Sequence, residues 1–193
     1  MFTNEQLQAM IRQESVSEQY PYSTKDEQEL KNYLKSMLAE LERMKIRCNV
    51  EDDHFGSGYA SYMSWFCYED ASIQVVEDGV TRSIEMHGLQ VLISRLAPVV
   101  VIGNAYESSS YLLKTGDYLG GGNSMLSAPD DLTIAPPFQA LANTLERILM
   151  KYQFTMLRKE DLAVPLPFEA DIPTLFRSKG RYLVWDAVFY WED

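Results

Sequence analysis

The sequence predicts an α+β fold in which two N-terminal helices and one late helix pack on a mainly antiparallel sheet. Apolar residues recur at helical spacing in the first fifty residues and again near residue 140, whereas residues 59–102 are rich in aromatic and β-branched side chains. The 193 residues, 46% hydrophobic and 23% charged, can bury a core, and we expect a single domain over residues 1–193.

Capping signals mark the two N-terminal helices. Thr3 and Gln6 have the spacing of a capping box and predict a helix over about 3–13, followed by a loop over 14–23. Thr24 and Glu27 form a second box before a helix over about 25–44. Its apolar stripe is regular over two heptads, which favours packing on a sheet over a dimerising coiled coil.

The middle of the chain predicts strands. Residues 59–68 are predicted to form one strand. Residues 72–77 and 80–86 are predicted to form a hairpin, and the Asp78-Gly79 turn between them suits type I′. Residues 88–98 fit a helical template and a strand equally, and we expect two further strands joined near Arg95–Pro98.

The remaining segments are less periodic. Residues 108–136, which contain Gly120–Gly122, predict a long loop that is functional or mobile. A helix over about 137–152 and a short strand over 154–157 follow, then a proline-rich surface path. Residues 182–191 predict a buried closing strand.

Charge is concentrated in the middle of the chain. The formal net charge is −11, and residues 51–131 hold 12 acidic but only 3 basic residues, while both ends are nearly neutral. An acidic chain does not suit nucleic-acid binding, which requires Lys and Arg to neutralise phosphates. The acidic block is either ordinary solvation of a surface or a face presented to a basic protein partner.

Several other classes are not expected. No apolar run reaches the roughly 18 residues that span a bilayer, so we expect no membrane association. The N-terminus lacks a basic segment followed by an apolar one, so we expect no signal peptide and a cytoplasmic location. Cys48 and Cys67 are too few for a disulfide scaffold, and we expect both to be inert.

No catalytic motif stands out, and we expect no catalytic residues, no metal and no cofactor. Gly120–Gly122 lacks the lysine and spacing of a phosphate-binding loop. A small enzyme would need Asp52, Asp53, His54 and His87 to meet across strands. Otherwise these four residues are ordinary turn and surface groups.

Acidic groups interleaved with tyrosines are the remaining signal, because such a surface can steer and anchor a basic protein. The predicted partner-binding residues are Glu69, Asp70, Glu77, Asp78, Glu85, Tyr106, Glu107, Tyr111, Asp117, Tyr118, Asp130 and Asp131.

The C-terminal part, about residues 145–193, supplies a resemblance. The segments that carry it are Tyr152–Leu157, Lys159–Leu162, Pro165–Pro167, Ile172–Leu175 and Val184–Asp193. Together they resemble small acidic bacterial immunity proteins that are encoded beside secreted polymorphic toxins. The resemblance implies a cytoplasmic, non-enzymatic inhibitor that binds one toxin domain, and it transfers no binding residue.

Two hypotheses therefore stand at this point. The first is an immunity protein that occludes a basic toxin domain, and the alternative is an intracellular adaptor domain with an unrelated partner. The sequence leaves the partner's identity, the oligomeric state and the strand order open.

Overall fold

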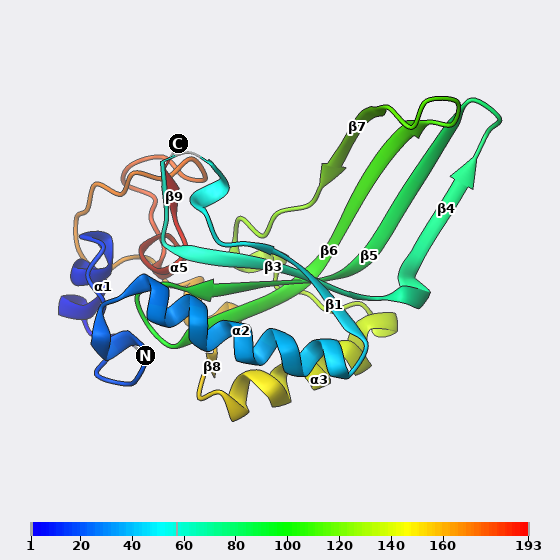
Figure 1. Cartoon of the computed structure of the whole chain (residues 1–193). Helices are drawn as coiled ribbons and strands as arrows, with labels where there is room; N and C mark the ends of the chain where they lie inside the picture. The colour runs from blue at the N-terminus through cyan, green and yellow to red at the C-terminus, as the bar shows by residue number, and fades with distance from the viewer. Residues whose placement is uncertain (1, 57, 193) are drawn as a thin grey trace.

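The fold is α+β, built on a mainly antiparallel seven-stranded sheet. The computed structural model describes residues 2–56 and 58–192 (Figure 1). The sheet runs in the order β1-β3-β5-β6-β7, with β4 paired to β5 and β8 paired in parallel to β6. The strands are β1 Ile46–Glu51, β3 Tyr62–Glu69, β4 Ile73–Glu77, β5 Thr81–Ser94, β6 Val99–Leu112, β7 Tyr118–Asn123 and β8 Thr155–Met156.

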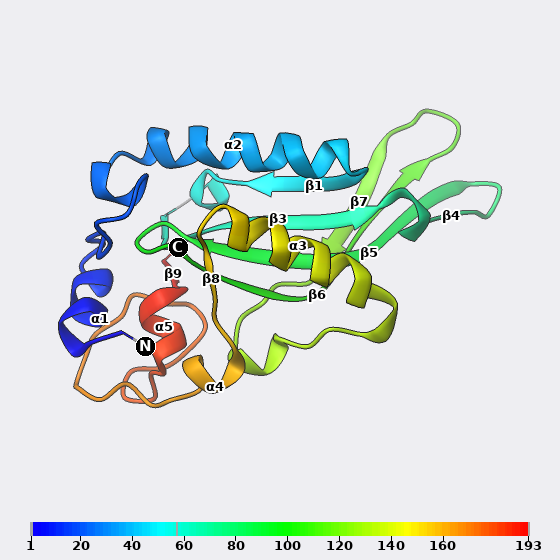
Figure 2. The same cartoon turned by 90° about the horizontal axis from the view of Figure 1, so that it is seen from below.

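Two helices cover one face of this sheet, which we call the helix face. They are α2 (Glu27–Arg43) and α3 (Gln139–Lys151), and Figure 2 shows both running along the strands. Their apolar stripes pack on Trp65, Val91 and Ile102 in the larger of the two main cores. The apolar residues that recur at helical spacing in the sequence are therefore buried against the helix face.

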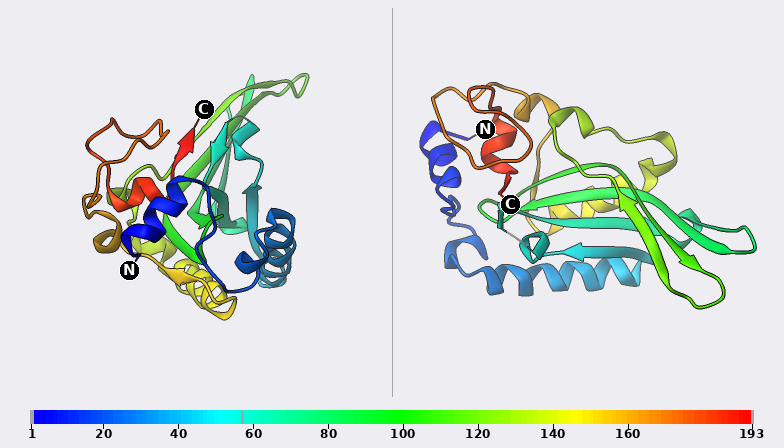
Figure 3. Two further views of the ribbon diagram at one scale, coloured as in Figure 1. Left: turned by 90° about the vertical axis from the view of Figure 1, so that its left-hand side faces the viewer. Right: turned by 90° about the horizontal axis from the view of Figure 1, so that it is seen from above.

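A second core lies on the opposite face, which we call the hollow face. There Tyr62, Leu92 and Val101 pack against the N- and C-terminal segments. These segments contain α1 (Asn4–Ile11), α4 (Lys159–Leu162), α5 (Val184–Val188) and β9 (Trp191–Glu192), and β9 pairs with β2 (Tyr59–Ala60) in a small second sheet. Figure 3 shows them gathered at one end of the molecule.

The other end of the sheet projects away from both cores. The two longest strands, β5 and β6, pair over their whole length, and β4 and β7 flank only their outer halves. In Figures 1 and 2 this part extends past the ends of α2 and α3. We call this part the β arm. It consists of β4, residues 81–87 of β5, residues 106–112 of β6, β7 and the connecting loops 78–80 and 113–117.

Most predicted elements are confirmed. Residues 88–98 are strand followed by a turn, which resolves the ambiguity in favour of two strands, and the helices over 3–13, 25–44 and 137–152 lie within a few residues of their predicted bounds. The second capping box is wrong, because Asp26 caps α2 by accepting from the Gln28 amide, while Thr24 belongs to the preceding 3₁₀ turn Tyr22–Thr24. The strand over 59–68 is broken at Ser61 into β2 and β3.

The predicted long loop over 108–136 is wrong over its first half. Residues 108–112 continue β6, and Gly120–Gly122 belong to β7. The arm is solvated on both faces, so its strands lack the apolar alternation that predicts a strand. The glycines permit close pairing, since a Cβ on Gly121 would lie 2.2 Å from the Ser108 carbonyl oxygen.

The predicted closing strand over 182–191 is also wrong. Residues 184–188 form α5, whose Trp185, Ala187 and Val188 are fully buried. A short segment buried on every side is apolar throughout, so its periodicity cannot separate helix from strand.

The hairpin at residues 73–86 is confirmed, but its turn is shifted by one residue. Glu77 pairs with Arg82, and the Asp78 amide donates to the Thr81 carbonyl, so Gly79 and Val80 are the central residues. Only Gly79 has a positive φ, of 88°, which fits a glycine-first turn rather than type I′.

Among the helices of the described ranges, none combines the length and apolar character required to cross a bilayer.

Candidate protein-binding surface

The β arm exposes both faces of a four-stranded sheet. Directly paired residues share a face, so the strand register assigns each side chain. The hollow face of the arm carries Val75, Ile84, Glu107, Tyr111 and Tyr118. The helix face carries Val76, Ser83, Glu85, His87, Tyr106 and Ser110.

Exposed apolar side chains gather on this arm. Of the thirteen large hydrophobic residues that are exposed in the described ranges, seven belong to it. They are Val75, Val76, Val80, Tyr106, Leu113, Tyr118 and Leu119. Val76, Val80 and Tyr118 are each more than 60% exposed. A cluster of this kind on a projecting element is typical of a protein-interaction site.

Two ring contacts organise the tyrosines. Tyr111 and Tyr118 meet edge-to-face with ring centroids 5.6 Å apart, and Tyr106 lies 6.4 Å from the His87 ring on the other face. Such contacts restrict the rings before any partner binds, which lowers the entropy cost of using them as anchors.

Eight of the twelve predicted partner-binding residues lie on the β arm: Glu77, Asp78, Glu85, Tyr106, Glu107, Tyr111, Asp117 and Tyr118. The arm carries five acidic residues against Arg82 and Lys114. Asp78 accepts from the Val80 and Thr81 amides, and these hydrogen bonds hold the pKa of its carboxyl below the usual range. Asp78 therefore shapes the arm tip and keeps its charge there.

The other four predicted residues are separate from the arm. Asp131 accepts from the Ser127 and Ala128 amides, and Asp130 pairs with Lys159 at 2.6 Å, so both stabilise the 3₁₀ turn Pro129–Asp131. Hydrogen bonding to Lys159 lowers the pKa of Asp130. The acidic block of the sequence is thus not one continuous face.

Glu69 and Asp70 lie at the base of the arm. Asp70 pairs with Arg47 at 2.5 Å. Glu69 and His87 line a groove of about 480 Å³ between the arm and the start of α3, where Phe138 and Leu141 form the apolar wall.

A hollow of about 220 Å³ lies on the hollow face where the arm leaves the body. Its polar wall includes Asn49, Gln90 and Glu107, and its apolar wall includes Phe55 and Phe66. The Asn49 side-chain amide donates to Glu107 Oε2 at 2.6 Å. Burial raises the pKa of Glu107, and the Asn49 hydrogen bond opposes that rise.

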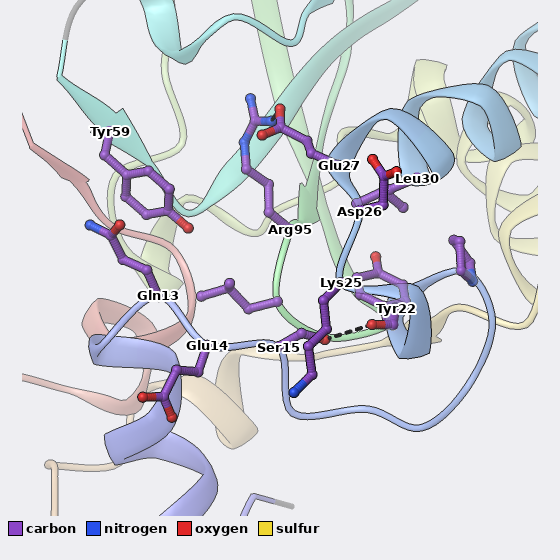
Figure 4. A pocket seen from close by; sticks show the side chains of 12 residues that line it. Gln13, Glu14, Ser15, Tyr22, Lys25, Asp26, Glu27, Leu30, Tyr59 and Arg95 are labelled. Carbon is purple, nitrogen blue, oxygen red and sulfur yellow. Dashed lines mark hydrogen bonds and ion pairs between the residues drawn. The ribbon is translucent and has the colours of Figure 1, made fainter.

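A further pocket of about 370 Å³ lies beside Arg95, at the start of α2 (Figure 4). The Arg95 side chain is only 4% exposed and binds the Glu27 carboxylate and the Tyr62 and Asp52 carbonyls. Burial raises the pKa of Tyr59, whose hydroxyl points into this pocket, to about 12. Because Arg95 and Glu27 neutralise each other, this pocket presents no strong net charge.

His54 and His87, which a small enzyme would bring together, lie in different parts of the structure. His54 stacks on Tyr59 and accepts from the Ala60 amide, whereas His87 lies on the arm beside Glu85 and Tyr106. Over residues 2–56 and 58–192, His, Cys, Asp and Glu side chains form no group of three that could hold a metal ion.

Sequence reasoning missed the exposed valines and leucines of the arm and the role of Asn49. The valines flank the Asp78-Gly79 turn. The predicted hairpin has apolar residues on both of its faces, and this pattern could have indicated that some of them are exposed. Nothing in the sequence links Asn49 to Glu107, because β1 and β6 are not neighbours in the sheet.

Comparison of the chain with protein-family models, with curated proteins and with solved structures finds no match.

Proposed function

We propose that this chain is an acidic binding protein that uses its β arm to contact a basic protein domain, as an immunity protein would contact its toxin. The observation that carries the proposal is the concentration of exposed apolar and tyrosine side chains on a sheet extension that projects beyond the helices. Leaving these side chains in water brings no benefit to folding, whereas a partner can bury them.

Electrostatics on the arm favours a basic partner. The arm carries five carboxylates together with three tyrosines, and the whole chain has a net charge of −11. Complementary charge raises the association rate, while desolvated aromatic anchors supply most of the affinity. A nuclease-type toxin domain is basic because its substrate is a polyanion, and an arm laid across its active site would occlude that substrate.

The hollow at the base of the arm offers a site for one basic side chain of the partner. It combines the half-buried Glu107 carboxylate, the Asn49 and Gln90 amides and the Phe66 ring, and the residues that line it include no Lys or Arg. An arginine or lysine side chain of the partner matches this lining, because it pairs with the carboxylate and packs on the ring.

The adaptor hypothesis rests on part of the same surface. Val76, Val80, Leu113 and Leu119 bring apolar rather than acidic surface to the arm, and this favours an apolar partner surface. The two hypotheses differ in salt dependence, since a basic partner dissociates faster and associates more slowly as ionic strength rises.

Binding to the product of the neighbouring gene, which the proposal expects to carry a basic toxin domain, tests the proposal. We expect Val75→Ser and Tyr118→Ser, both on the hollow face of the arm, each to weaken binding about tenfold or more, by loss of buried anchors. Met150→Ser is the matched control, because Met150 is 67% exposed on α3. No binding by the wild-type chain at low salt, or an equal loss with Met150→Ser, overturns the proposal.

A further inference from the structure

The only two cysteines of the chain lie directly opposite each other on neighbouring strands. Cys48 of β1 and Cys67 of β3 are partners in the antiparallel register. Both carry free thiols, and their Sγ atoms are 2.6 Å apart. They are nineteen positions apart in the sequence, so the fold alone creates this contact.

The backbone at this position already suits a disulfide. Directly opposed residues of an antiparallel pair have Cα atoms about 4.5–5.5 Å apart, and disulfides span about 4.4–6.8 Å. Both side chains point to the helix face, where they pack in the core beneath α2. Linking them therefore needs no change of register between β1 and β3.

The two thiols differ in accessibility. Cys67 is fully buried, whereas Cys48 is partly exposed on β1, an edge strand of the sheet. A small reagent in solution would reach Cys48 first. The proximity of Cys67 would then favour closure of the pair over attack on Cys48 by a second molecule of thiol.

We propose that Cys48 and Cys67 are a modification site, which closes to an intramolecular disulfide by exchange with a small-molecule disulfide such as glutathione disulfide. The Cys48 thiolate attacks one sulfur of the reagent, forms a mixed disulfide and releases one glutathione thiolate. The Cys67 thiolate then attacks the Cys48 sulfur and releases the second. Two protein thiols are oxidised and one glutathione disulfide is reduced to two glutathione molecules, which take up the two protons.

The second step is the slow one. Burial and the neighbouring Cys48 raise the pKa of the Cys67 thiol, so little thiolate is present at neutral pH. Closure should therefore accelerate as the pH rises, although the product is favoured by the contact between the two sulfurs.

Closure would affect the binding surface through β1. The residues on either side of Cys48 point to the opposite face, where Arg47 holds Asp70 and Asn49 holds Glu107. A disulfide fixes β1 to β3 between these two contacts, so it stabilises one wall of the hollow. The modification itself does not depend on the identity of any partner.

Equilibration of the full chain with glutathione redox buffers, followed by acid quenching and intact-mass measurement, tests this inference. We expect the folded chain to lose two hydrogens without retaining glutathione. Half-oxidation should occur at a glutathione-disulfide level at least about tenfold lower than for the urea-unfolded chain. The oxidised chain should melt about 5 °C or more higher.

Single-cysteine variants separate the two steps. Cys67→Ser should stop at a mixed disulfide on Cys48, and Cys48→Ser should leave the buried Cys67 unmodified while folded. The inference is overturned if the folded wild-type chain keeps both thiols, or stops at the mixed disulfide, in buffers that oxidise the unfolded chain. The wild-type measurement decides this even where a variant fails to fold.

Discussion

The side-chain amide of Asn49 donates a hydrogen bond of 2.6 Å to Glu107 across two intervening strands. In a flat sheet, β1 and β6 would lie about 14 Å apart. The contact therefore requires the sheet to curl toward its hollow face, and it joins the edge strand to the base of the β arm. This contact fixes the position of the Glu107 side chain in the folded chain.

Removal of this contact should change the pKa of Glu107. In Asn49→Ala the half-buried carboxylate loses the hydrogen bond that lowers its pKa, so that pKa should rise further. The free energy of unfolding should fall by about 0.5–1.5 kcal/mol. Side-chain NMR titration of Glu107 checks the first expectation and urea unfolding the second. An unchanged Glu107 pKa would contradict the role given to Asn49.

The stability of the chain should depend on the ionisation of Glu107. Burial raises the pKa of this carboxyl in the folded state. As the pH rises above the ordinary glutamate range, the unfolded chain releases this proton first, so the free energy of unfolding falls until the folded group has also ionised. Glu107→Gln abolishes this titration and retains an acceptor for Asn49.

The difference in unfolding free energy, variant minus wild type, should therefore become more positive between about pH 4 and pH 7. Urea denaturation at both values measures it. A difference that is constant or that moves in the opposite direction rules out a raised pKa for Glu107.

Two adjacent glycines of β7 should respond differently to alanine. A Cβ on Gly121 would lie 2.2 Å from the Ser108 carbonyl oxygen, whereas the nearest atom for Gly122 is the Ser108 hydroxyl at 3.8 Å. Gly121→Ala should thus displace β7 and cost about 1–3 kcal/mol, and Gly122→Ala should stay within about 0.5 kcal/mol.

Amide hydrogen exchange in β7 together with urea unfolding checks this pair. Faster exchange confined to Gly121→Ala would match the close approach of β7 to β6. Equal effects of the two substitutions would show that the spacing between these strands is not limiting.

The ion pair between Glu27 and Arg95 should stabilise the junction of α2 with the sheet. Arg95 is buried, and Glu27 is its carboxylate partner. Glu27→Gln leaves the guanidinium without a counter-charge and should lower the free energy of unfolding by about 1–3 kcal/mol. Glu29→Gln, which removes another first-turn charge of α2 and affects an exposed hydrogen bond from Tyr20, should cost less than about 0.5 kcal/mol. Similar costs in calorimetry or urea unfolding would contradict this.

The elements with one buried face were predictable from the sequence, and those with two equivalent faces were not. The stripe of Leu30, Leu34, Met37 and Leu41 identifies α2, because only one side of that helix is buried. β7 is solvated on both faces and α5 is buried on all sides, so neither has a periodicity that distinguishes helix, strand and loop.

The candidate site was predictable in its location but not in its chemistry. The hairpin around Asp78-Gly79 and the tyrosines at 106, 111 and 118 indicated where exposed residues lie, and all of them belong to the β arm. The acidic block misled in part, because Asp130 and Asp131 satisfy a local turn. Contacts between distant strands, such as Asn49–Glu107 and Cys48–Cys67, depend on strand order, which sequence patterns do not specify.

Hydrogen–deuterium exchange of the full chain, alone and mixed with the product of the neighbouring gene, which the proposed function takes as the partner, tests the central claim most directly. We expect slower exchange in the complex for the amides of β4, β7 and the loops at the arm tip, with exposed amides of α2 and α3 unchanged. Protection confined to the α2 and α3 surface, with the arm exchanging as in the free chain, would contradict it.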